Sequence, residues 1–537
     1  MTISFSSEIQ LPSVLKYSME DVMTNLKCSL NRITSRMVLV FPPETIHEGQ
    51  CFCRFEPDGI ALLKGFLKER GYSFVDLVYA PVAPETTMEM MCPDKSKGWG
   101  ISPFDEEGIS FRNMMHSALN LSLNSSTAKL LMNLLPLSTL INTSIIGFSI
   151  GFSSQLYHSL ILSRIVKQLN PNIFVVFGGP LITATINFVV ELQELSCHVD
   201  GIIAGYGEEP LAQLLLCLEN KGELKNVPNL YLPTAEGFRL NVATWKPDKT
   251  NLLTIPDYGR ATLAREFDPC FPVRPSIGCY WGKCAFCVYP SMSTGTSKKR
   301  QSVILTPEEL VEYIKSLMKN GSGNNFELCC DSLPPLYLKK FSEQVLMSNL
   351  KIKWTAWACV DKRFTDAGIL DTMKSAGCES ILLGVESACQ RTLERMNKMQ
   401  TRQDIDHVLT AFFSSGIGLF VTLFIGFPGE TREEAMQTIE FIQRILNDRV
   451  ISTCIEMRLY RFVLMCNTPI VEHISDYNIS SVDWSDVYHL EDVFGYHYEV
   501  AEGMGFTEVE SFVLEWRSQL GIKTDDSYLN LGAVLDN

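Results

Sequence analysis

The segment IGCYWGKCAFC at residues 277–287 carries the strongest signal in the sequence. Its three cysteines, Cys279, Cys284 and Cys287, lie within nine residues, in a glycine-containing loop that follows an apolar run typical of a strand. Thiolates hold iron–sulfur clusters, and three of them can bind three irons of a cubane. The fourth iron then stays open to a substrate or a second cofactor. The pattern therefore predicts a four-iron–four-sulfur (4Fe-4S) cluster on these three cysteines.

Two other interpretations of the three cysteines stay open at this point. A zinc site normally takes a fourth Cys or His at a similar spacing, and none follows nearby. Cysteine is also a frequent small buried residue, so the three could belong to a hydrophobic core. The cluster is the favoured interpretation because all three thiols fall in one short loop.

Composition limits the classes of function that the chain can have. The chain has 537 residues, a hydrophobic fraction of 46% and a net charge of −15, so it can bury large cores and does not suit a polyanionic nucleic acid as partner. Its 17 cysteines are an odd number over a long chain, which favours a reducing compartment. No secretory signal is visible, and polar residues and a proline interrupt the most apolar stretch, 130–152. We expect a cytoplasmic protein without a membrane span.

Apolar strands alternate with amphipathic helices in the first half of the chain. This alternation predicts a parallel, doubly wound sheet of Rossmann type, with its ligand site beyond the carboxyl ends of the strands. Helices are expected at 58–71, around 111–135, at 155–169 and from 211 onward. The expected strands are 37–41, 74–79, 144–150, 173–177 and 201–204.

A second alternating series begins near residue 273 and suits a partial (β/α)6 barrel, with its chemistry at the carboxyl ends of the strands. Its strands are expected at 273–277, 326–330, 353–358, 380–384, 419–426 and 455–461. Strand periodicity puts Trp354 and Trp357 on opposite faces of the third of these strands. The expected domains are an N-terminal extension (1–36), a Rossmann-like domain (37–220), a connector (221–270), the partial barrel (271–464) and a mostly helical C-terminal region (465–537).

The cysteine loop resembles that of the radical S-adenosylmethionine (SAM) superfamily. In this family a three-cysteine loop follows the first barrel strand and has an aromatic residue before the last cysteine, as Phe286 does here. The family commonly has three residues between the first two cysteines, whereas this chain has four. The wider loop is similar to that of some cobalamin-binding members. The resemblance implies that SAM binds the open iron.

Segments downstream of the loop resemble the family's SAM-handling positions, in order and spacing. They include 330–334, 377–387, 396–398 and 416–431. The resemblance implies that Glu386, with Ser387 beside it, accepts from the SAM ammonium or ribose hydroxyls, and that Gly426 lets the backbone approach the adenine. Taken alone, Glu386 could instead be a carboxylate at a helix start. Related enzymes often carry an arginine in the third strand, where Cys359 or Arg363 could serve.

Residues 37–220 resemble the cobalamin-binding (B12-binding) domain that precedes the barrel in B12-dependent radical SAM enzymes. Glycines at strand ends would let the nucleotide tail of the cofactor approach the backbone. The implied cobalamin residues are Ser149, Gly178, Gly179, Gly205, Gly207 and Glu208. The Asp-x-His-x-x-Gly motif for a histidine ligand is absent, and His47, His116 and His158 lack its partners. Cobalamin is therefore expected without a protein histidine on cobalt.

The resemblance implies a cobalamin-dependent radical SAM methyltransferase that methylates an unactivated carbon through a 5′-deoxyadenosyl radical and methylcobalamin. A B12-binding radical SAM enzyme that cyclises or rearranges its substrate is one alternative, and a non-catalytic iron–sulfur protein is another. The expected partners are a peptide or small-molecule substrate and an external electron donor of flavodoxin or ferredoxin type. No catalytic acid or base is assigned.

Overall fold

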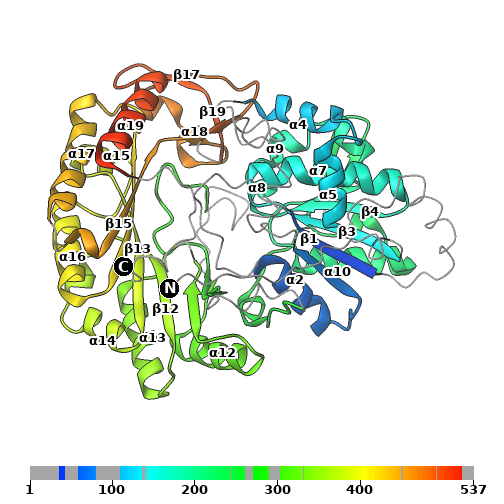
Figure 1. Ribbon diagram of the computed structural model, residues 1–537. Coiled ribbons are helices and arrows are strands. Elements are labelled where there is room, and N and C mark those ends of the chain that lie inside the picture. Colours follow the sequence, from blue (N-terminus) through cyan, green and yellow to red (C-terminus); the bar gives the residue numbers. More distant parts are fainter. Residues whose placement is uncertain are drawn as a thin grey trace, which may run out of the picture.

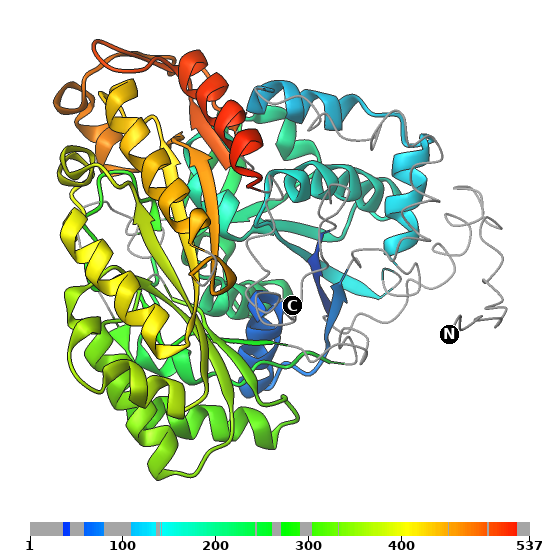
Figure 2. The ribbon, with the colours of Figure 1, turned by 60° about the vertical axis from the view of Figure 1, so that its left-hand side comes forward.

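A computed structural model of the protein describes residues 36–42, 58–79, 109–135, 140, 142–241, 244–259, 270–289, 303–330, 332–448, 451–490 and 493–522. These residues form two α/β units that lie side by side (Figures 1 and 2). Among them, no helix has the length and apolar character needed to cross a bilayer.

The first unit is built on a seven-stranded sheet in the order β2-β1-β3-β4-β5-β6-β7, in which β1 to β5 run parallel. Side chains of β1 alternate between two cores. Met37 and Leu39 face a core shared with α2 and α10, whereas Val38 and Val40 face α4, α5 and α7. The sheet is therefore covered on both faces, as predicted. Its parallel strands are β1 (Arg36–Phe41), β2 (Val75–Tyr79), β3 (Thr143–Ser149), β4 (Phe174–Gly178) and β5 (Gly201–Ile203); its helices are α2 (Asp58–Glu69), α4 (Phe111–Asn120), α5 (Ser126–Leu134), α7 (Ser153–Leu169) and α10 (Glu208–Leu216).

A hairpin extends this sheet into the expected connector. Strands β6 (Leu230–Thr234) and β7 (Gly237–Leu240) pair antiparallel with each other, and β6 pairs antiparallel with β5. Gly237 has a φ of 108°, and a Cβ on it would lie 2.3 Å from the backbone oxygen of Val190. Glycine is therefore required where the hairpin turns against the loop after α9 (Ile186–Val189). Part of 221–270 is thus structurally continuous with the first unit.

The second unit is a six-stranded parallel sheet in the order β8-β11-β12-β13-β14-β15. Capping boxes at Thr306, Thr401 and Thr431 begin three of its helices, since each hydroxyl accepts from a backbone N–H of the first turn. The predicted partial barrel is confirmed. Its strands are β8 (Phe271–Val273), β11 (Asn325–Leu328), β12 (Lys353–Cys359), β13 (Cys378–Glu386), β14 (Gly418–Ile425) and β15 (Ile455–Arg461); its helices are α12 (Pro307–Lys319), α13 (Pro335–Met347), α14 (Ile369–Ser375), α15 (Gln390–Arg395), α16 (Arg402–Ser415) and α17 (Arg432–Asn447).

The two tryptophans of β12 lie on opposite faces, as the strand period predicts. Trp354 is fully buried against Phe341 of α13, with 5.4 Å between ring centroids. The indole of Trp357 donates instead to the Glu327 carboxylate of β11 at 2.7 Å. Trp357 and Glu327 therefore face the barrel interior.

The C-terminal segment joins the two units and contains more strand than expected. Helix α19 (Phe506–Leu520) packs on β15 and lies above the barrel in Figure 1. Short strands form two small antiparallel sheets before it: β16 (Leu464–Met465), β17 (Ile479–Val482), β18 (Tyr488–Leu490), β19 (Val493–Tyr496) and β20 (Tyr498–Val500). The amide of Phe111 donates to Val487 at 2.7 Å, and that of Ile470 to Ala285 at 2.9 Å. The C-terminal segment is thus hydrogen-bonded to both units.

One apolar core runs through both units. It includes Phe148 and Phe177 of the first sheet, Phe424 of β14 and Tyr496 of β19. Because burial of apolar surface is the main favourable term in association, this shared core fixes how the two sheets face each other.

Candidate active site

The cysteine loop is held by a distant segment of the barrel. It follows β9 (Ser276–Ile277) and is tied to the residues after α15 by three hydrogen bonds. Trp281 Nε1 donates to the Asn397 carbonyl at 2.8 Å, Asn397 Nδ2 donates to Lys283 at 2.9 Å, and the Ala285 amide donates to Met396 at 2.9 Å. The predicted SAM segment 396–398 therefore positions the cluster loop in this structure.

The three thiols lie at the carboxyl ends of the barrel strands. Cys284 is buried, while Cys279 and Cys287 are partly exposed. Burial raises the pKa of Cys284 to about 11, and the nearby ammonium of Lys398 opposes part of that shift. Among the described residues, no three His, Cys, Asp or Glu side chains are arranged as a site for a single metal ion. The residues fit a cluster, because each thiolate would bind a different iron and a buried cation lies beside them.

Cys359, at the end of β12, lies against the cysteine loop. Its thiol shares a hydrogen bond with the thiol of Cys279, which raises the pKa of Cys279 and lowers that of Cys359. Arg363, the other candidate for the third-strand position, instead forms an ion pair with Asp361, which also accepts from Tyr280. Cys359 thus contacts the cysteine loop directly, and Arg363 is linked to the loop through Asp361 and Tyr280.

Glu386 lies at the end of β13 and is not at a helix start, since α15 begins only at Gln390. Its φ is 66°, in the left-handed region that costs a non-glycine residue about 1–3 kcal/mol. The carboxylate pairs with Lys398 at 3.2 Å and accepts from Thr422 at 3.2 Å. A Cβ on Gly384 would come within 2.4 Å of Glu386 Oε1. Gly384 therefore makes room for the carboxylate at the barrel mouth.

Lys398 is a buried cation. The sequence indicated it only as one residue of the segment 396–398. Its side chain is 3% exposed. Burial alone would lower its pKa, but Glu386 and the thiols of Cys284 and Cys359 raise the pKa overall. A permanent positive charge beside the thiols stabilises their ionised form, which is the form that binds iron.

Two residues predicted for SAM have close neighbours from other parts of the chain. The hydroxyl of Ser387 lies 3.3 Å from that of Thr438 in α17 and accepts from the Cys389 amide at 3.1 Å. A Cβ on Gly426 would lie 2.4 Å from Val509 of α19, so its open side is filled by the C-terminal helix. The Ser387 hydroxyl and the Cβ side of Gly426 are therefore occupied by neighbouring residues, and their roles in SAM binding stay predictions.

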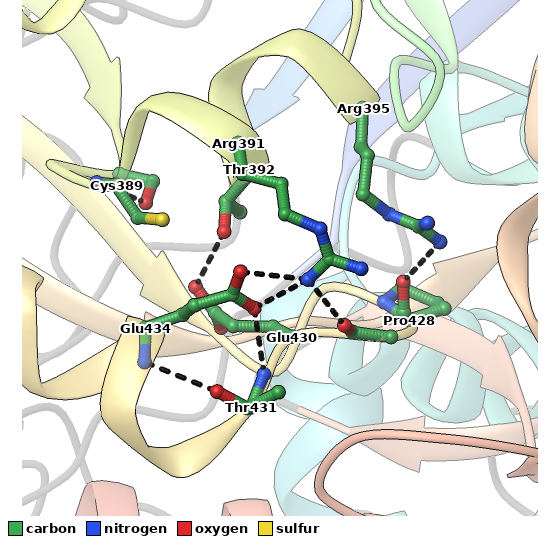
Figure 3. Close-up of polar contacts among 10 residues, drawn as sticks. Cys389, Arg391, Thr392, Arg395, Pro428, Glu430, Thr431 and Glu434 are labelled. Atoms are coloured by element: carbon green, nitrogen blue, oxygen red, sulfur yellow. Dashed lines mark hydrogen bonds and ion pairs between the residues drawn. The ribbon is translucent and has the colours of Figure 1, made fainter.

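The loop after β14 carries a buried carboxyl that the sequence did not single out (Figure 3). Glu430 accepts from the Gly426 amide at 2.6 Å and from Thr392 at 3.3 Å. Beside it, Arg391 pairs with Glu434, and Arg395 donates to the Pro428 carbonyl at 2.9 Å. Burial raises the pKa of Glu430 to about 7. This network joins α15 to the start of α17.

Phe286 is partly buried and contacts the barrel. Its ring meets that of Phe424 on β14 edge to face, with 5.0 Å between centroids. The aromatic residue before the last cysteine therefore anchors the loop on the fifth barrel strand.

A cavity of about 330 Å³ lies between the two units. All six residues predicted for cobalamin line it: Ser149, Gly178, Gly179, Gly205, Gly207 and Glu208. Barrel residues close its other side, among them Arg274, Ser276, Gly278 and Cys330. The cavity therefore connects the strand ends of the first sheet with the residue that precedes Cys279, and its volume falls in the range of ligand sites.

Two glycines at the cavity differ in whether the fold requires them to be glycine. Gly179 has a φ of 104°, and a Cβ there would lie 2.5 Å from the backbone of Ile150. A Cβ on Gly178 would meet Ile203 at ordinary distances, 3.4 Å from its backbone oxygen and 4.0 Å from its Cβ. Gly179 is thus required by the fold, whereas the fold tolerates a small side chain at position 178.

Two of the three histidines that lack the ligand motif can be located. His116 is exposed, and His158 is buried beside Tyr157; neither lines the cavity. His47 and Asp331 lie outside the described residues.

Comparison with known proteins identifies both units. Residues 273–442 match the Radical SAM superfamily, and residues 138–215 match the B12 binding domain. The chain thus carries a B12-binding domain followed by a radical SAM domain. The first match implies a 4Fe-4S cluster and SAM, and the second implies cobalamin.

Two curated relatives and one solved structure illustrate the similarity. An uncharacterized methyltransferase of Pyrococcus horikoshii is 31% identical over 304 residues, which are 55% of this chain and 62% of the relative. The anaerobic magnesium-protoporphyrin IX monomethyl ester cyclase of Rubrivivax gelatinosus is 24% identical over 306 residues, 56% of this chain and 54% of the relative. This chain thus spans little more than half the length of these relatives.

The cobalamin-dependent SAM radical enzyme OxsB, solved with aqua-cobalamin and SAM bound, superimposes with a TM-score of 0.58 at 16% identity. The superposition covers 82% of this chain and 60% of that one. At this identity the likeness concerns the fold of the covered part alone.

Proposed function

We propose that this chain, with its B12-binding and radical SAM domains, is a cobalamin-dependent radical SAM methyltransferase that acts on an unactivated carbon. The observation that carries the proposal is the cavity between the domains, which is lined by Gly178 and Gly205 on one side and by Gly278, next to Cys279, on the other. Methyl transfer to a substrate radical requires the two cofactor sites to share one space.

The cluster loop would bind iron through Cys279, Cys284 and Cys287. When bound, the reduced cluster would supply the electron that cleaves SAM, and cobalamin would supply the methyl group. The Lys398 ammonium offsets the negative charge of the thiolates from a buried position. Because that cation is fixed before the cluster arrives, the site does not have to reorganise in order to stabilise it.

Glu386 would hold the SAM molecule. Its carboxylate is fixed by Lys398 and Thr422 at the barrel mouth, on the same rim as the thiols. In this proposal it accepts a hydrogen bond from the ammonium or the ribose hydroxyls of SAM. A carboxylate that is already oriented loses little freedom when it binds a ligand.

Cyclisation or rearrangement without methyl transfer is the second candidate. It is favoured by the similarity to a cyclase, whereas the similarity to a methyltransferase favours methylation. In either case we propose a peptide or small-molecule substrate and an external donor of flavodoxin or ferredoxin type.

The test uses anaerobically reconstituted protein. Cluster and cobalamin absorption bands should appear together, and reduction should release 5′-deoxyadenosine from SAM. With SAM labelled at its methyl group, label in the product of a substrate library supports methyl transfer. Turnover with unlabelled product would support the second candidate, and absence of SAM cleavage by protein that carries its cluster would contradict both.

A further inference from the structure

The end of β12 brings a fourth thiol to the cysteine loop. Cys359 is the last residue of this strand and is 8% exposed. Its thiol is hydrogen-bonded to the thiol of Cys279. The proposed cluster uses Cys279, Cys284 and Cys287 and leaves Cys359 without a function. Because Cys359 contacts the sulfur of a proposed ligand directly, it can act on the cluster without any residue in between.

Ser332 fixes the Cys359 side chain from the other side. The Cys359 amide donates to Ser332 Oγ at 2.8 Å, and the same hydroxyl is hydrogen-bonded to the Cys359 thiol. Ser332 is 2% exposed, so water competes little for these bonds. An oxygen that accepts from the amide has its own hydrogen to donate to the sulfur. The hydrogen of the Cys359 thiol is then left for Cys279.

Electrostatic repulsion decides which of the two sulfurs carries the hydrogen when iron is bound. A cysteine that binds iron is a thiolate, so Cys279 would have no hydrogen to donate. A second thiolate in contact with it would be repelled strongly in a buried site. The hydrogen between the two sulfurs removes this repulsion, and it then belongs to Cys359. Iron would therefore reverse the direction of the hydrogen bond that raises the pKa of Cys279 in the structure.

A hydrogen bond to a cluster sulfur affects the reduction potential of the cluster. Reduction adds negative charge, and a donor stabilises the more negative state to a greater degree. Cys279 also accepts from the backbone amides of Trp281 and Gly282. Those two amides belong to the cysteine loop itself, whereas Cys359 is a side chain from a distant strand. Cys359 is therefore a donor that a substitution can remove without changing the loop.

We propose that the Cys359 thiol donates a hydrogen bond to the iron-bound sulfur of Cys279 and thereby raises the reduction potential of the cluster. The inference rests on the proposed binding of the cluster by the cysteine loop. Cys359 is a positioning residue in this proposal, because it acts through Cys279, and Ser332 orients it. A higher potential makes the cluster easier for the external donor to reduce.

The test is a redox titration of the reconstituted full-length protein without SAM, in which electron paramagnetic resonance measures the reduced cluster. Cys359→Ala removes the donor and should lower the equilibrium constant of reduction by about three- to tenfold, the value of one neutral hydrogen bond. For one electron this is about 30–60 mV. Cys359→Ser keeps a donor and should stay closer to the wild-type potential. Ser332→Ala keeps every thiol and should cause a smaller shift in the same direction.

Cys378→Ala is the matched control, because Cys378 is a buried cysteine at the opposite end of the neighbouring strand β13. Its cluster should have the wild-type potential. Iron content should be full in all four variants, which separates a change of potential from loss of the cluster. Ser332→Ala carries the test if the changes at Cys359 prevent folding.

Wild-type potentials in both Cys359→Ala and Ser332→Ala would overturn the proposal. Equal shifts in the alanine and serine variants of Cys359 would overturn it too, because the serine variant keeps a donor. Loss of iron from folded Cys359→Ala would make Cys359 a ligand of the cluster and would also overturn it. A wild-type chain that takes up no cluster would contradict the proposed iron binding itself, which is a separate outcome.

Discussion

The two rims at the central cavity would hold their ligands by different means. The Rossmann rim combines six glycines, among them Gly178 and Gly205, with mainly apolar side chains around a space of about 330 Å³. The barrel rim is crowded with directed side chains, in which thiols lie beside the Glu386–Lys398 ion pair. We therefore expect ligand binding at the Rossmann rim to be lost when a substitution adds volume. At the barrel rim we expect it to be lost when a functional group is removed.

The largest effect should follow from removing a thiol on the barrel rim. Cys284→Ala should lose the bound cluster and with it all formation of 5′-deoxyadenosine, because a cubane held by three thiolates cannot keep a full ligand set on two. Iron content and 5′-deoxyadenosine release are the measurements. Cobalamin uptake should persist, since the glycine rim belongs to the other unit.

The matched control for the cysteine change is Cys197→Ala, which alters an exposed thiol of the Rossmann unit. Full iron content and SAM cleavage by the triple alanine variant of Cys279, Cys284 and Cys287 would contradict the assignment of the cluster.

Added volume on the Rossmann rim should come next. Gly178→Leu should prevent cobalamin uptake while it leaves iron content unchanged, because its side chain extends from the end of β4 into the cavity. Gly178→Ala is the graded control, since a Cβ there meets only an ordinary contact at 3.4 Å. Cobalamin absorbance after gel filtration is the measurement. Normal cobalamin uptake by the leucine variant would show that cobalamin does not bind in this cavity.

A smaller effect is expected from the charged group of the barrel rim. Glu386→Gln should weaken SAM binding by roughly tenfold to a hundredfold, since a hydrogen bond to a charged group contributes about 1.5–3 kcal/mol. Binding is measured by calorimetry on protein that carries its cluster. Glu379→Gln, at the other end of β13, should bind SAM normally. If both variants bind SAM with equal affinity, Glu386 does not bind SAM and has only a structural role as the partner of Lys398.

The smallest effect concerns the buried carboxyl behind the barrel rim. Burial raises the pKa of Glu430 from 4.5 to about 7, so its contribution to stability is fully present below pH 4.5 and is lost as the pH rises through 7. Between pH 5 and pH 8 this loss should amount to about 2 kcal/mol. The free energy of unfolding of Glu430→Gln, measured with urea, should not show this loss between pH 5 and pH 8.

The control for the carboxyl test is Glu440→Gln, an exposed position on the same helix, α17. Its pH profile should follow that of the wild type. A wild type that unfolds more easily at pH 5 than the Glu430→Gln protein, and not at pH 8, would reverse the sign of the expected shift.

Periodicity predicted the regular elements well, but it did not show which distant residues the loops contact. All six barrel strands and the five parallel Rossmann strands lie within a few residues of their expected bounds. The hairpin of β6 and β7 was missed, although Gly237 marked its turn. Its strands are short and partly exposed, so they lack the continuous apolar run by which the other strands were recognised.

The roles of single residues depended on distant neighbours. Gly426 was expected to approach a ligand, but Val509 occupies its open side. Ser387 was expected at the SAM site, but its hydroxyl meets Thr438. In both cases the partner lies on a helix later in the chain, and no local spacing identifies it.

The sequence by itself determined the features that arise from neighbouring residues. Three thiols in one loop, strand–helix alternation and glycines at strand ends are all local, so residue type and spacing are enough to predict them. Only the tertiary structure decided that Cys359 contacts Cys279, that Asn397 holds the cysteine loop, and that Arg274 meets Glu208. Each of these contacts joins residues that lie between 66 and 114 positions apart in the chain. They follow from how the two sheets pack, and packing depends on the whole buried surface.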